Sequence, residues 1–327
     1  MIETDFTKLI GCEAPIQQAP MGKGATTPSL AAAVANAGGL GMLSLSGYAV
    51  DVLENVIRET YRLTSKKIGA NFLLYQPIDI ESLEATAELV DVVDFFWGKP
   101  DKKLIEIGKR AGALVAWQVG SGEEARLAED AGCDFIIAQS IEAGGHVRGK
   151  IGLLPLLDQV ISSVKIPVLA SGGIGSGAAL AAVLDAGASG VRCGTRFLAA
   201  YECAAHPEYV QALIDAEASD TVYTDKFSVG WADAPHRVLR ASLMAATEFE
   251  GECVGTSFDP NLGVTREIPK FGVVDIHKGV SGHIEAMPQW AGESVGAVTK
   301  RQAASEIINE MIGDARKILQ GELPPVF

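Results

Sequence analysis

A histidine preceded by two glycines is the segment of this chain best suited to proton transfer. His146 follows Gly144 and Gly145, directly after an apolar run that predicts a strand. Glycines let a backbone pass close to a flat ligand, and an imidazole that titrates near neutrality suits transfer of a proton to or from carbon. A Gly-Gly-His sequence alone is weak support, but its place at a strand's carboxyl end favours His146 as a catalytic residue.

Two glycine-rich turns late in the chain are suited to holding a phosphate. The first runs Ser171-Gly-Gly-Ile-Gly-Ser-Gly177 before an alanine-rich helix, and the second runs Cys193-Gly-Thr-Arg196. Such turns direct N–H groups into a hollow, and a following helix N-terminus favours an anion. Phosphate sites in barrel enzymes lie between the loops after strands seven and eight, where both turns fall. Two ordinary βα turns remain the alternative.

A third glycine motif, Gly120-Ser-Gly-Glu-Glu-Ala125, also follows a strand and opens a helix, as a dinucleotide fingerprint would. Glu123 and Glu124 would stand where the pyrophosphate must go. Acidic side chains in a first helical turn are ordinary capping chemistry, so we interpret this motif as structural.

The remaining histidines are less well placed for chemistry. His206 precedes Pro207, which is typical of a helix boundary, while His236, His277 and His283 either line the pocket or lie on the surface. The spacing of histidines and carboxylates does not suit metal ligation, so we expect no metal site.

Earlier strand ends carry residues suited to a flat ring. Ala19-Pro-Met21 ends the first strand, where proline fixes the backbone and methionine offers a polarisable face. Asn71 and Gln118 end the third and fifth strands, and their amides can bond the polar edge of an isoalloxazine ring as donor and acceptor.

Short apolar, β-branched runs alternate with helical patterns, which is the signature of parallel βα units. The expected strands are Ile16–Met21, Leu40–Leu45, Ile68–Leu74, Val90–Trp97, Ala113–Val119, Phe135–Ser140, Val168–Ser171 and Gly190–Gly194. The expected helices include Ser29–Ala37, Val50–Arg62, Asp101–Ala111, Glu123–Ala131, Leu153–Val164 and Ala178–Ala186. Eight units favour a (β/α)₈ TIM barrel, with a doubly wound sheet as the alternative.

The pattern changes after the eighth strand. We assign residues 1–204 to the barrel core, 205–289 to an insertion that covers the barrel mouth, and 290–327 to a closing helical segment. The insertion is expected to contain helices Tyr209–Ala218 and Arg237–Phe249, and Ser294–Leu319 reads as one long amphipathic helix. The hydrophobic core of this insertion would be too small to fold stably alone, so the insertion is not expected to be an independent domain.

The composition of the chain limits the kinds of partner that we expect it to bind. The 27 basic and 41 acidic residues give a net charge of −14, which disfavours nucleic acid. The uncharged stretch from Gly24 to Val50 contains Pro28 and several glycines, so it is not expected to be a membrane span. The five scattered cysteines indicate free thiols, and the N-terminus lacks a signal pattern, so a cytoplasmic protein is expected.

Taken together, five segments resemble the nitronate monooxygenase family. They are Pro15-Ile-Gln-Gln-Ala-Pro-Met21, Ala33-Val-Ala-Asn-Ala-Gly-Gly-Leu-Gly41, Glu142-Ala-Gly-Gly-His146, Ala170-Ser-Gly-Gly-Ile174 and Gly194-Thr-Arg-Phe-Leu198, and Trp290-Ala-Gly-Glu-Ser294 resembles the family's C-terminal element. The resemblance implies a TIM barrel that binds FMN without a covalent bond. His146 matches the family's catalytic histidine.

The same resemblance implies where each part of FMN would bind. The implied cofactor residues are Ala19, Pro20, Met21, Asn71, Gln118, Gln139, Ala143, Gly144, Gly145, Ser171, Gly172, Gly173, Cys193, Gly194 and Thr195. Relatives often carry a lysine at the position of Gln118 and an acid at that of Gln139. The uncharged pair here leaves open how the N1–C2 region of the flavin is tuned.

Two enzyme functions follow from the resemblance. The first is oxidation of alkyl nitronates or nitroalkanes by FMN and O₂, with His146 as base. The alternative is a reductase of enoyl thioesters or quinones, in which NAD(P)H reduces FMN and His146 donates a proton. Arg148 and the length of the insertion favour the monooxygenase. A flavin-binding barrel without turnover is the non-enzymatic alternative, and a homodimer is a candidate assembly.

Overall fold

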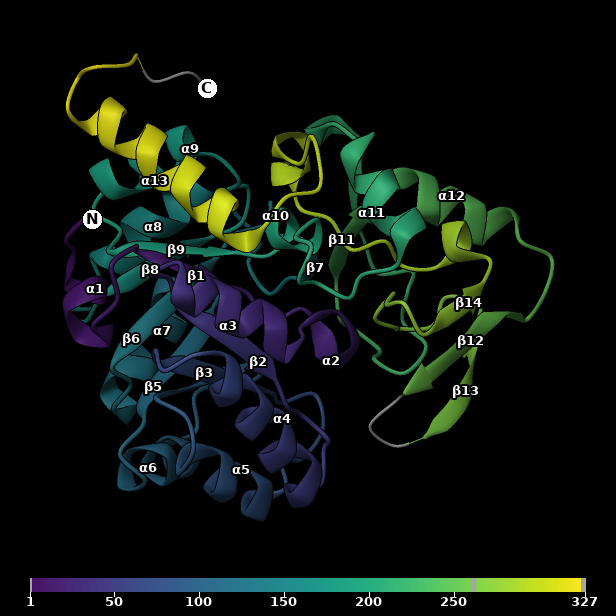
Figure 1. Cartoon of the computed structure of the whole chain (residues 1–327), viewed down its shortest axis with the longest axis horizontal. Coiled ribbons are helices and arrows are strands. Elements are labelled where there is room, and N and C mark those ends of the chain that lie inside the picture. The colour runs from purple at the N-terminus through teal and green to yellow at the C-terminus, as the bar shows by residue number, and fades with distance from the viewer. Residues whose placement is uncertain (1, 260–262, 325–327) are drawn as a thin grey trace.

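Eight parallel strands form one sheet in the computed structural model, which describes residues 2–259 and 263–324 (Figure 1). The strands are β1 (Ile16–Gln18), β2 (Gly41–Ser44), β3 (Ile68–Leu73), β4 (Val92–Phe96), β5 (Leu114–Val119), β6 (Phe135–Gln139), β8 (Val168–Ser171) and β9 (Gly190–Cys193). Their order in space is β1-β9-β8-β6-β5-β4-β3-β2. Backbone bonds from Gln18 N to Leu40 O (3.0 Å) and from Leu40 N to Ile16 O (2.9 Å) join the two edges, so the predicted barrel is confirmed.

Alternate residues of each strand point into the barrel and form layers, as the two-residue period of a strand requires. The lower layers are apolar: Met42, Val92, Ala116, Phe135 and Ile137 pack there on Phe6 and Ile10 of α1 (Asp5–Ile10), which closes the bottom. Two residues further along the strands the inward side chains become polar. The barrel therefore has an apolar base beneath a polar mouth.

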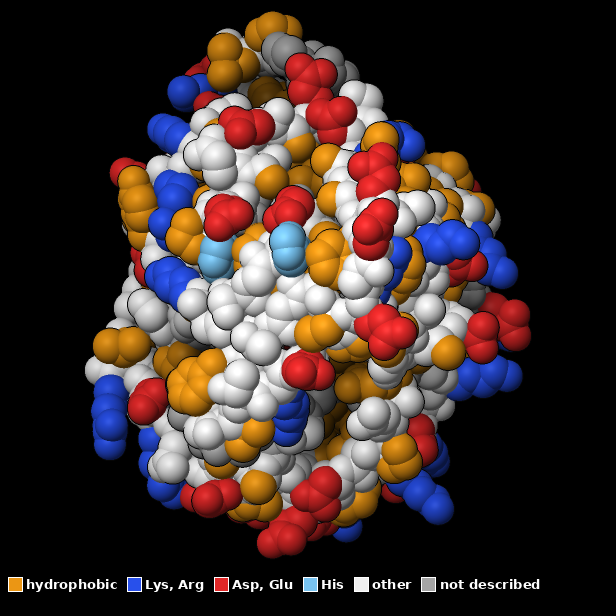
Figure 2. All heavy atoms as spheres, turned by 90° about the vertical axis from the view of Figure 1, so that its right-hand side faces the viewer, with side chains coloured by type: hydrophobic (Ala, Val, Ile, Leu, Met, Phe, Trp, Pro, Cys, Tyr) orange, Lys and Arg blue, Asp and Glu red, His pale blue; other side chains and the backbone are white. Residues whose placement is uncertain are grey.

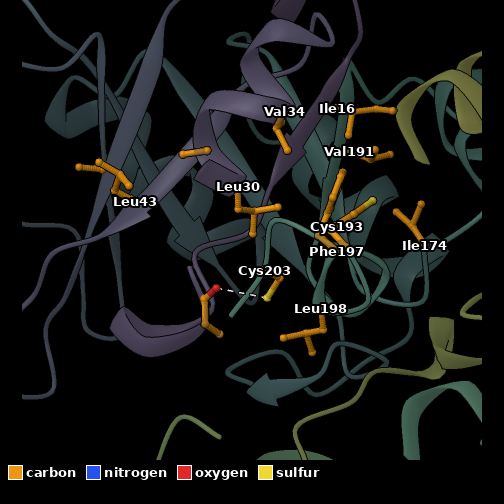
Figure 3. Packing of buried hydrophobic residues seen from close by; sticks show 14 of the residues in the cluster. Ile16, Leu30, Val34, Leu43, Ile174, Val191, Cys193, Phe197, Leu198 and Cys203 are labelled. Carbon is orange, nitrogen blue, oxygen red and sulfur yellow. Dashed lines mark hydrogen bonds between the residues drawn. The ribbon is translucent and has the colours of Figure 1, made fainter. Parts of the chain in front are cut away.

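Helices cover the outside of the barrel (Figure 1). They are α3 (Pro28–Asn36), α4 (Val50–Leu63), α5 (Ile80–Ala87), α6 (Lys102–Arg110), α7 (Gly122–Ala131), α8 (Leu153–Ile161) and α9 (Gly177–Asp185), with the short helices α2 (Gly22–Ala25) and α10 (Thr195–Leu198). Figure 3 shows the core between strands and helices, where Ile16, Val34 and Val191 lie among the buried side chains.

The expected closing helix is shorter than predicted. Residues Glu293–Ala297 form a 3₁₀ turn, and α13 begins only at Ala304 and runs to Leu319. It packs on α9 and α3 and so takes the place of a full eighth barrel helix, because α10 is a single turn. A Cβ on Gly177 would lie 2.7 Å from the Met311 carbonyl, which explains why glycine begins α9 at this close crossing.

Residues 205–259 and 263–289 form an extension over the carboxyl ends of the barrel strands, on the right of Figure 1. It contains α11 (Pro207–Ile214), β10 (Thr221–Thr224), β11 (His236–Leu239), α12 (Arg240–Glu248), β12 (Cys253–Asp259), β13 (Val264–Pro269), β14 (Val280–Gly282) and 3₁₀ turns at Ala218–Asp220 and Ile284–Ala286. One antiparallel sheet has the order β13-β12-β14. Figure 2 looks onto this side, where acidic, basic and apolar side chains are mixed and the surface is hollowed in the lower half of the view.

The second sheet of the extension includes two residues of the barrel. Its order is β10-β11-β7, and β7 is Gly145–His146, with His236 opposite His146. The helix predicted at Arg237–Phe249 is therefore wrong in its first turn, because Arg237 to Leu239 belong to β11 and α12 starts at Arg240. The extension is thus joined by backbone hydrogen bonding to the segment that carries the predicted catalytic residue.

Candidate active site

A cavity of about 680 Å³ lies at the barrel mouth, between the ends of the strands and the extension. The predicted site residues that line it are Ala19, Pro20, Met21, Asn71, Gln118, Gln139, Ala143, Gly144, Gly145, His146, Ser171, Gly172, Gly173, Gly194 and Thr195. These residues come from the ends of six strands, because parallel strands in a barrel all end at one face. This cavity therefore lies where barrel enzymes have their active sites.

The two glycine turns provide free N–H groups on one wall of the cavity. Gly172 and Gly173 have φ of +111° and +70°, which only glycine adopts without strain. A Cβ on Gly172 would overlap Ser140 Oγ. Within residues 2–259 and 263–324, the N–H groups of Gly173 and Gly194 have no acceptor, whereas the pairing of Ser171 with Arg192 directs Gly172 N–H toward the backbone of β9. Unpaired backbone donors that face a cavity suit an anion such as phosphate.

Thr195 connects this wall to the segment after the extension. Its Oγ1 accepts a hydrogen bond of 3.0 Å from Gly292 N, which leaves the hydroxyl proton available to a ligand. Gly144 and Gly292 are in backbone contact, since a Cβ on either would overlap the other's main chain. The Trp290–Ser294 segment is therefore a structural part of the site wall.

His146 lies inside a group of aromatic rings. Its ring centroid is 3.9 Å from Trp231, 5.2 Å from Trp290, 6.0 Å from Trp97 and 5.5 Å from His236. Burial, with a smaller contribution from His236, lowers the pKa of His146 to about 3. Its Nε2 atom is buried and has no hydrogen-bond partner in the described part of the chain. The imidazole is therefore neutral at physiological pH, with one ring nitrogen unused.

His236 is neutral as well, and its role is structural. Its Nδ1 lies 2.9 Å from the Ala234 carbonyl, which can only accept, and its Nε2 accepts a bond of 3.3 Å from Phe227 N. Both ring nitrogens are thus used by the backbone of the β10–β11 connection, and burial lowers the pKa of His236. Sequence reasoning left this residue either in the pocket or on the surface, and it is fully buried beside His146.

The amides at the mouth are partly occupied by the protein itself. Gln139 donates from Nε2 to the His146 carbonyl (2.9 Å), so it positions the backbone of β7. Asn71 donates from Nδ2 to the Asp94 carboxylate. Gln118 accepts at Oε1 from Arg192 Nη1 (2.7 Å), which leaves its NH₂ group available. Of these amides, Gln118 is the one best able to donate to a bound ring.

Cys193 is the predicted cofactor residue that does not line the cavity. Its side chain is buried in the core near Phe197 and Leu198 (Figure 3), and burial raises the pKa of its thiol to about 12. Inward and outward positions alternate along β9, so Arg192 faces the barrel interior and Cys193 faces the helices. The side chain of Cys193 therefore points away from the cavity, and a cofactor contact of this residue stays a prediction for its backbone.

Several residues of the cavity were not found from the sequence. Lys23, Tyr75, Arg192, Trp231 and Asp275 all line it. Trp231 and Asp275 come from the extension. The sequence of the extension has no regular hydrophobic period from which its fold could be predicted. Arg192 had a signal that could have been used: a charge at an inward position of a buried strand.

The other sequence predictions can be placed as well. Glu124 Oε2 accepts from Gly120 N (2.8 Å) and Ser121 caps α7, so the third glycine motif is structural, as predicted. Arg148 forms an ion pair with Glu124 and does not line the cavity, so it gives no support to either function. His206 is the N-cap of α11, as its helix-boundary assignment predicted. His277 bonds Ser257 and His283 is exposed beside Glu285.

Other expectations concern metals, cysteines and membranes. The residues the structure describes contain no cluster of histidine, cysteine and acidic side chains able to hold a metal ion. All five cysteines are free thiols. A search of those same residues found no helix long and apolar enough to span a membrane.

Comparison with known proteins adds independent findings. The sequence matches the family described as Nitronate monooxygenase over residues 3–91 and 81–314. It is 29% identical to the nitronate monooxygenase of Pseudomonas aeruginosa, over 95% of this chain and 99% of the relative. A second relative, 35% identical over 78% of this chain and 70% of its own length, is the (3aS,4S,5R,7aS)-5-hydroxy-7a-methyl-1-oxo-octahydro-1H-indene-4-carboxyl-CoA dehydrogenase of Rhodococcus jostii. Among solved structures, FabK from Thermotoga maritima superposes with a TM-score of 0.81 and 32% identity, covering 99% of this chain and 100% of FabK.

Proposed function

The chain belongs to the nitronate monooxygenase family of oxidoreductases, and we propose that it binds FMN and oxidises alkyl nitronates and nitroalkanes with O₂. The observation that carries the proposal is that His146, whose buried Nε2 has no partner in the described residues, lines the same cavity as the two glycine turns. A proton acceptor and an anion cradle in one cavity are what a phosphate-bearing redox cofactor and a carbon acid require.

The lining of the cavity fits FMN by its chemistry. Gly173 and Gly194 would hold the phosphate through N–H groups that have no acceptor among the described residues. Ala19, Pro20 and Met21 would offer an apolar surface to the ring, and Gln118 an amide to its polar edge. When bound, FMN would supply the acceptor of two electrons that amino-acid side chains do not provide.

His146 would act as the base for neutral nitroalkanes. Nε2 would take the proton from the carbon beside the nitro group, and the C–H electron pair would move into the nitro group to give the nitronate. The aromatic rings around His146 hold the imidazole in place. The imidazolium that forms would be stabilised by the negative charge of the nitronate beside it. A nitronate supplied as such has already lost this proton and needs no base.

The comparisons also support a second candidate, a flavin enzyme that oxidises or reduces acyl thioesters. The relative with 35% identity is named a carboxyl-CoA dehydrogenase. The carbon next to a thioester carbonyl is also a carbon acid, so His146 would have the same position and would move a proton at that carbon. In the reductive direction NAD(P)H would be the electron donor and His146 a proton donor.

Anaerobic mixing separates these candidates. The reconstituted protein is mixed with propionate 3-nitronate, with nitroethane, with NADPH and with a saturated acyl-CoA, and the flavin absorbance is followed. Loss of absorbance with the nitro compounds and not with NADPH or acyl-CoA supports the monooxygenase. Loss with NADPH or acyl-CoA, and none with the nitro compounds, would replace it with the thioester enzyme.

His146→Ala then tests the assigned base. The variant is expected to lose its activity on neutral nitroethane and to retain most of its activity on ethyl nitronate, because only the neutral compound needs the base. Equal losses on both compounds would show that His146 does not act by removing this proton.

A further inference from the structure

A buried charged pair lies across the barrel at the floor of the cavity. Arg192 on β9 forms an ion pair with Asp94 on β4, and the two side chains are 2% and 0% exposed. Arg192 also donates from Nη1 to Gln118 Oε1 (2.7 Å) and from Nε to Gln17 Oε1 (2.9 Å). The guanidinium is thus held by side chains of three other strands, which fixes its position in the barrel.

The two charges of the pair lie at different distances from the open space of the cavity. Arg192 lines the cavity, whereas Asp94 does not. Asp94 is fully buried and also accepts a hydrogen bond from Asn71, so its negative charge is enclosed by donors. The positive end of the pair therefore faces the space where a ligand would bind.

Arg192 and Gln118 keep N–H groups that are available to a ligand in that space. An arginine has five N–H groups, and three of them bond Asp94, Gln118 and Gln17. Gln118 uses its oxygen for Arg192, so what it can offer a ligand is its NH₂ group. A positive charge and an amide donor at the floor of a cavity are suited to an electron-rich carbonyl edge or to a ring that gains negative charge.

We propose that Arg192 stabilises the negative charge that the cofactor ring acquires on reduction, with Asp94 as the counter-charge that positions and moderates it. This inference rests on the proposed function, because it takes the ring to be that of FMN. A flavin that gains two electrons and one proton carries one negative charge more than its oxidised form. A fixed cation in a site that excludes water favours that form over the neutral one.

The test measures the reduction potential of bound FMN in the wild type and three variants: Asp94→Asn, Arg192→Gln and the double variant. The potential reports how much more tightly the reduced form binds than the oxidised form. Asp94→Asn removes the counter-charge, so the preference for reduced FMN is expected to rise about tenfold, which for a two-electron couple is about 30 mV. The double variant removes both charges and is expected to lower the preference below that of the wild type, by a similar factor.

The order of the four potentials decides the outcome. The proposal predicts Asp94→Asn highest, then wild type, then the double variant, with Arg192→Gln lowest because it leaves Asp94 alone. If Arg192→Gln does not fold, since it leaves a buried unpaired carboxylate, the other three still give the order. A structural role alone would change the stability of the variants and not shift their potentials in opposite directions.

Two failures can be told apart. If the wild type binds FMN but Asp94→Asn and the double variant leave its potential unchanged, or shift it in the same direction, the role of Arg192 is wrong and the proposed function stands. If the wild type takes up no FMN, both proposals fall. Arg192→Lys, which keeps the charge, is expected to restore most of the potential lost in Arg192→Gln.

Discussion

The imidazole of His146 and the indole of Trp231 lie face to face, with ring centroids 3.9 Å apart and planes inclined by 21°. Tyr75 stacks on Trp231 at 4.3 Å. Trp231 belongs to the connection between β10 and β11, so a residue of the extension shields a residue of the barrel. The extension therefore contributes to the burial that lowers the pKa of His146, and it also lines the cavity.

Replacing Trp231 with leucine is expected to raise the pKa of His146 from about 3 toward the 6.5 of an unburied imidazole. Burial is the main cause of the low pKa, and leucine covers less of the ring than indole does. An NMR titration of the His146 ring protons measures this directly. Tyr75→Phe keeps an aromatic ring on Trp231 and should leave the pKa low. An unchanged pKa in Trp231→Leu would contradict the assigned role of the stack.

The low pKa of His146 also predicts how stability depends on pH. A histidine whose pKa falls on folding takes up a proton first in the unfolded state, so the fold loses stability as the pH drops below 6.5. At pH 5 this loss amounts to at most about 2 kcal/mol from His146. Denaturant unfolding of the cofactor-free protein at pH 7.5 and pH 5 should show a smaller loss for His146→Gln than for wild type. Equal losses would mean that His146 titrates normally in the folded protein.

The turn at Gly172, which would hold the phosphate, can be tested with two glycine substitutions. Both place alanine at a position with a positive φ. Gly172→Ala places a methyl group against Ser140 at a φ of +111°, whereas Gly112→Ala has a φ of +91° and no atom within 4 Å of the added carbon. The left-handed backbone is expected to cost each variant about 1–2 kcal/mol, and Gly172→Ala is destabilised further by its overlap with Ser140. Only Gly172→Ala should also weaken FMN binding, by about tenfold or more, in a fluorescence titration. Equal FMN affinities in the two variants would exclude this turn from the phosphate site.

The cysteines give a prediction that does not depend on the cofactor. Cys253 is exposed, whereas Cys193 and Cys133 are buried and burial raises the pKa of each thiol to about 12. A thiol reagent should therefore modify Cys253 in the native protein long before it reaches Cys193, as peptide mass spectrometry can show. Early modification of Cys193 would mean that it faces the cavity after all.

The barrel could be predicted from the sequence because each strand is a short apolar run bounded by turn residues. The same alternation places Gln118 and Ser171 at the inner edge of the mouth, two residues beyond the apolar inward positions Ala116 and Leu169. It applies equally to Asp94 and Arg192, which lie at inward positions of β4 and β9. Two opposite charges within buried strands are a signal that sequence reasoning could have used.

The extension could not be predicted in the same way. The sequence predicts a helix already from Arg237, because Arg237 to Leu239 continue into the pattern of α12 without a breaking residue. Its pairing with β7 depends on contacts between residues far apart in the chain, which local propensity does not contain. Trp231 is held by ring stacking in an irregular loop, so neither a period nor a motif marks it.

The central claim is that the cavity at the barrel mouth binds FMN, and the absorption spectrum of the purified protein after incubation with FMN and gel filtration tests it most directly. The expected result is a yellow protein with flavin absorbance that releases FMN, and not FAD, when it is denatured. A colourless protein that retains no added FMN would contradict the cofactor assignment and the chemistry derived from it.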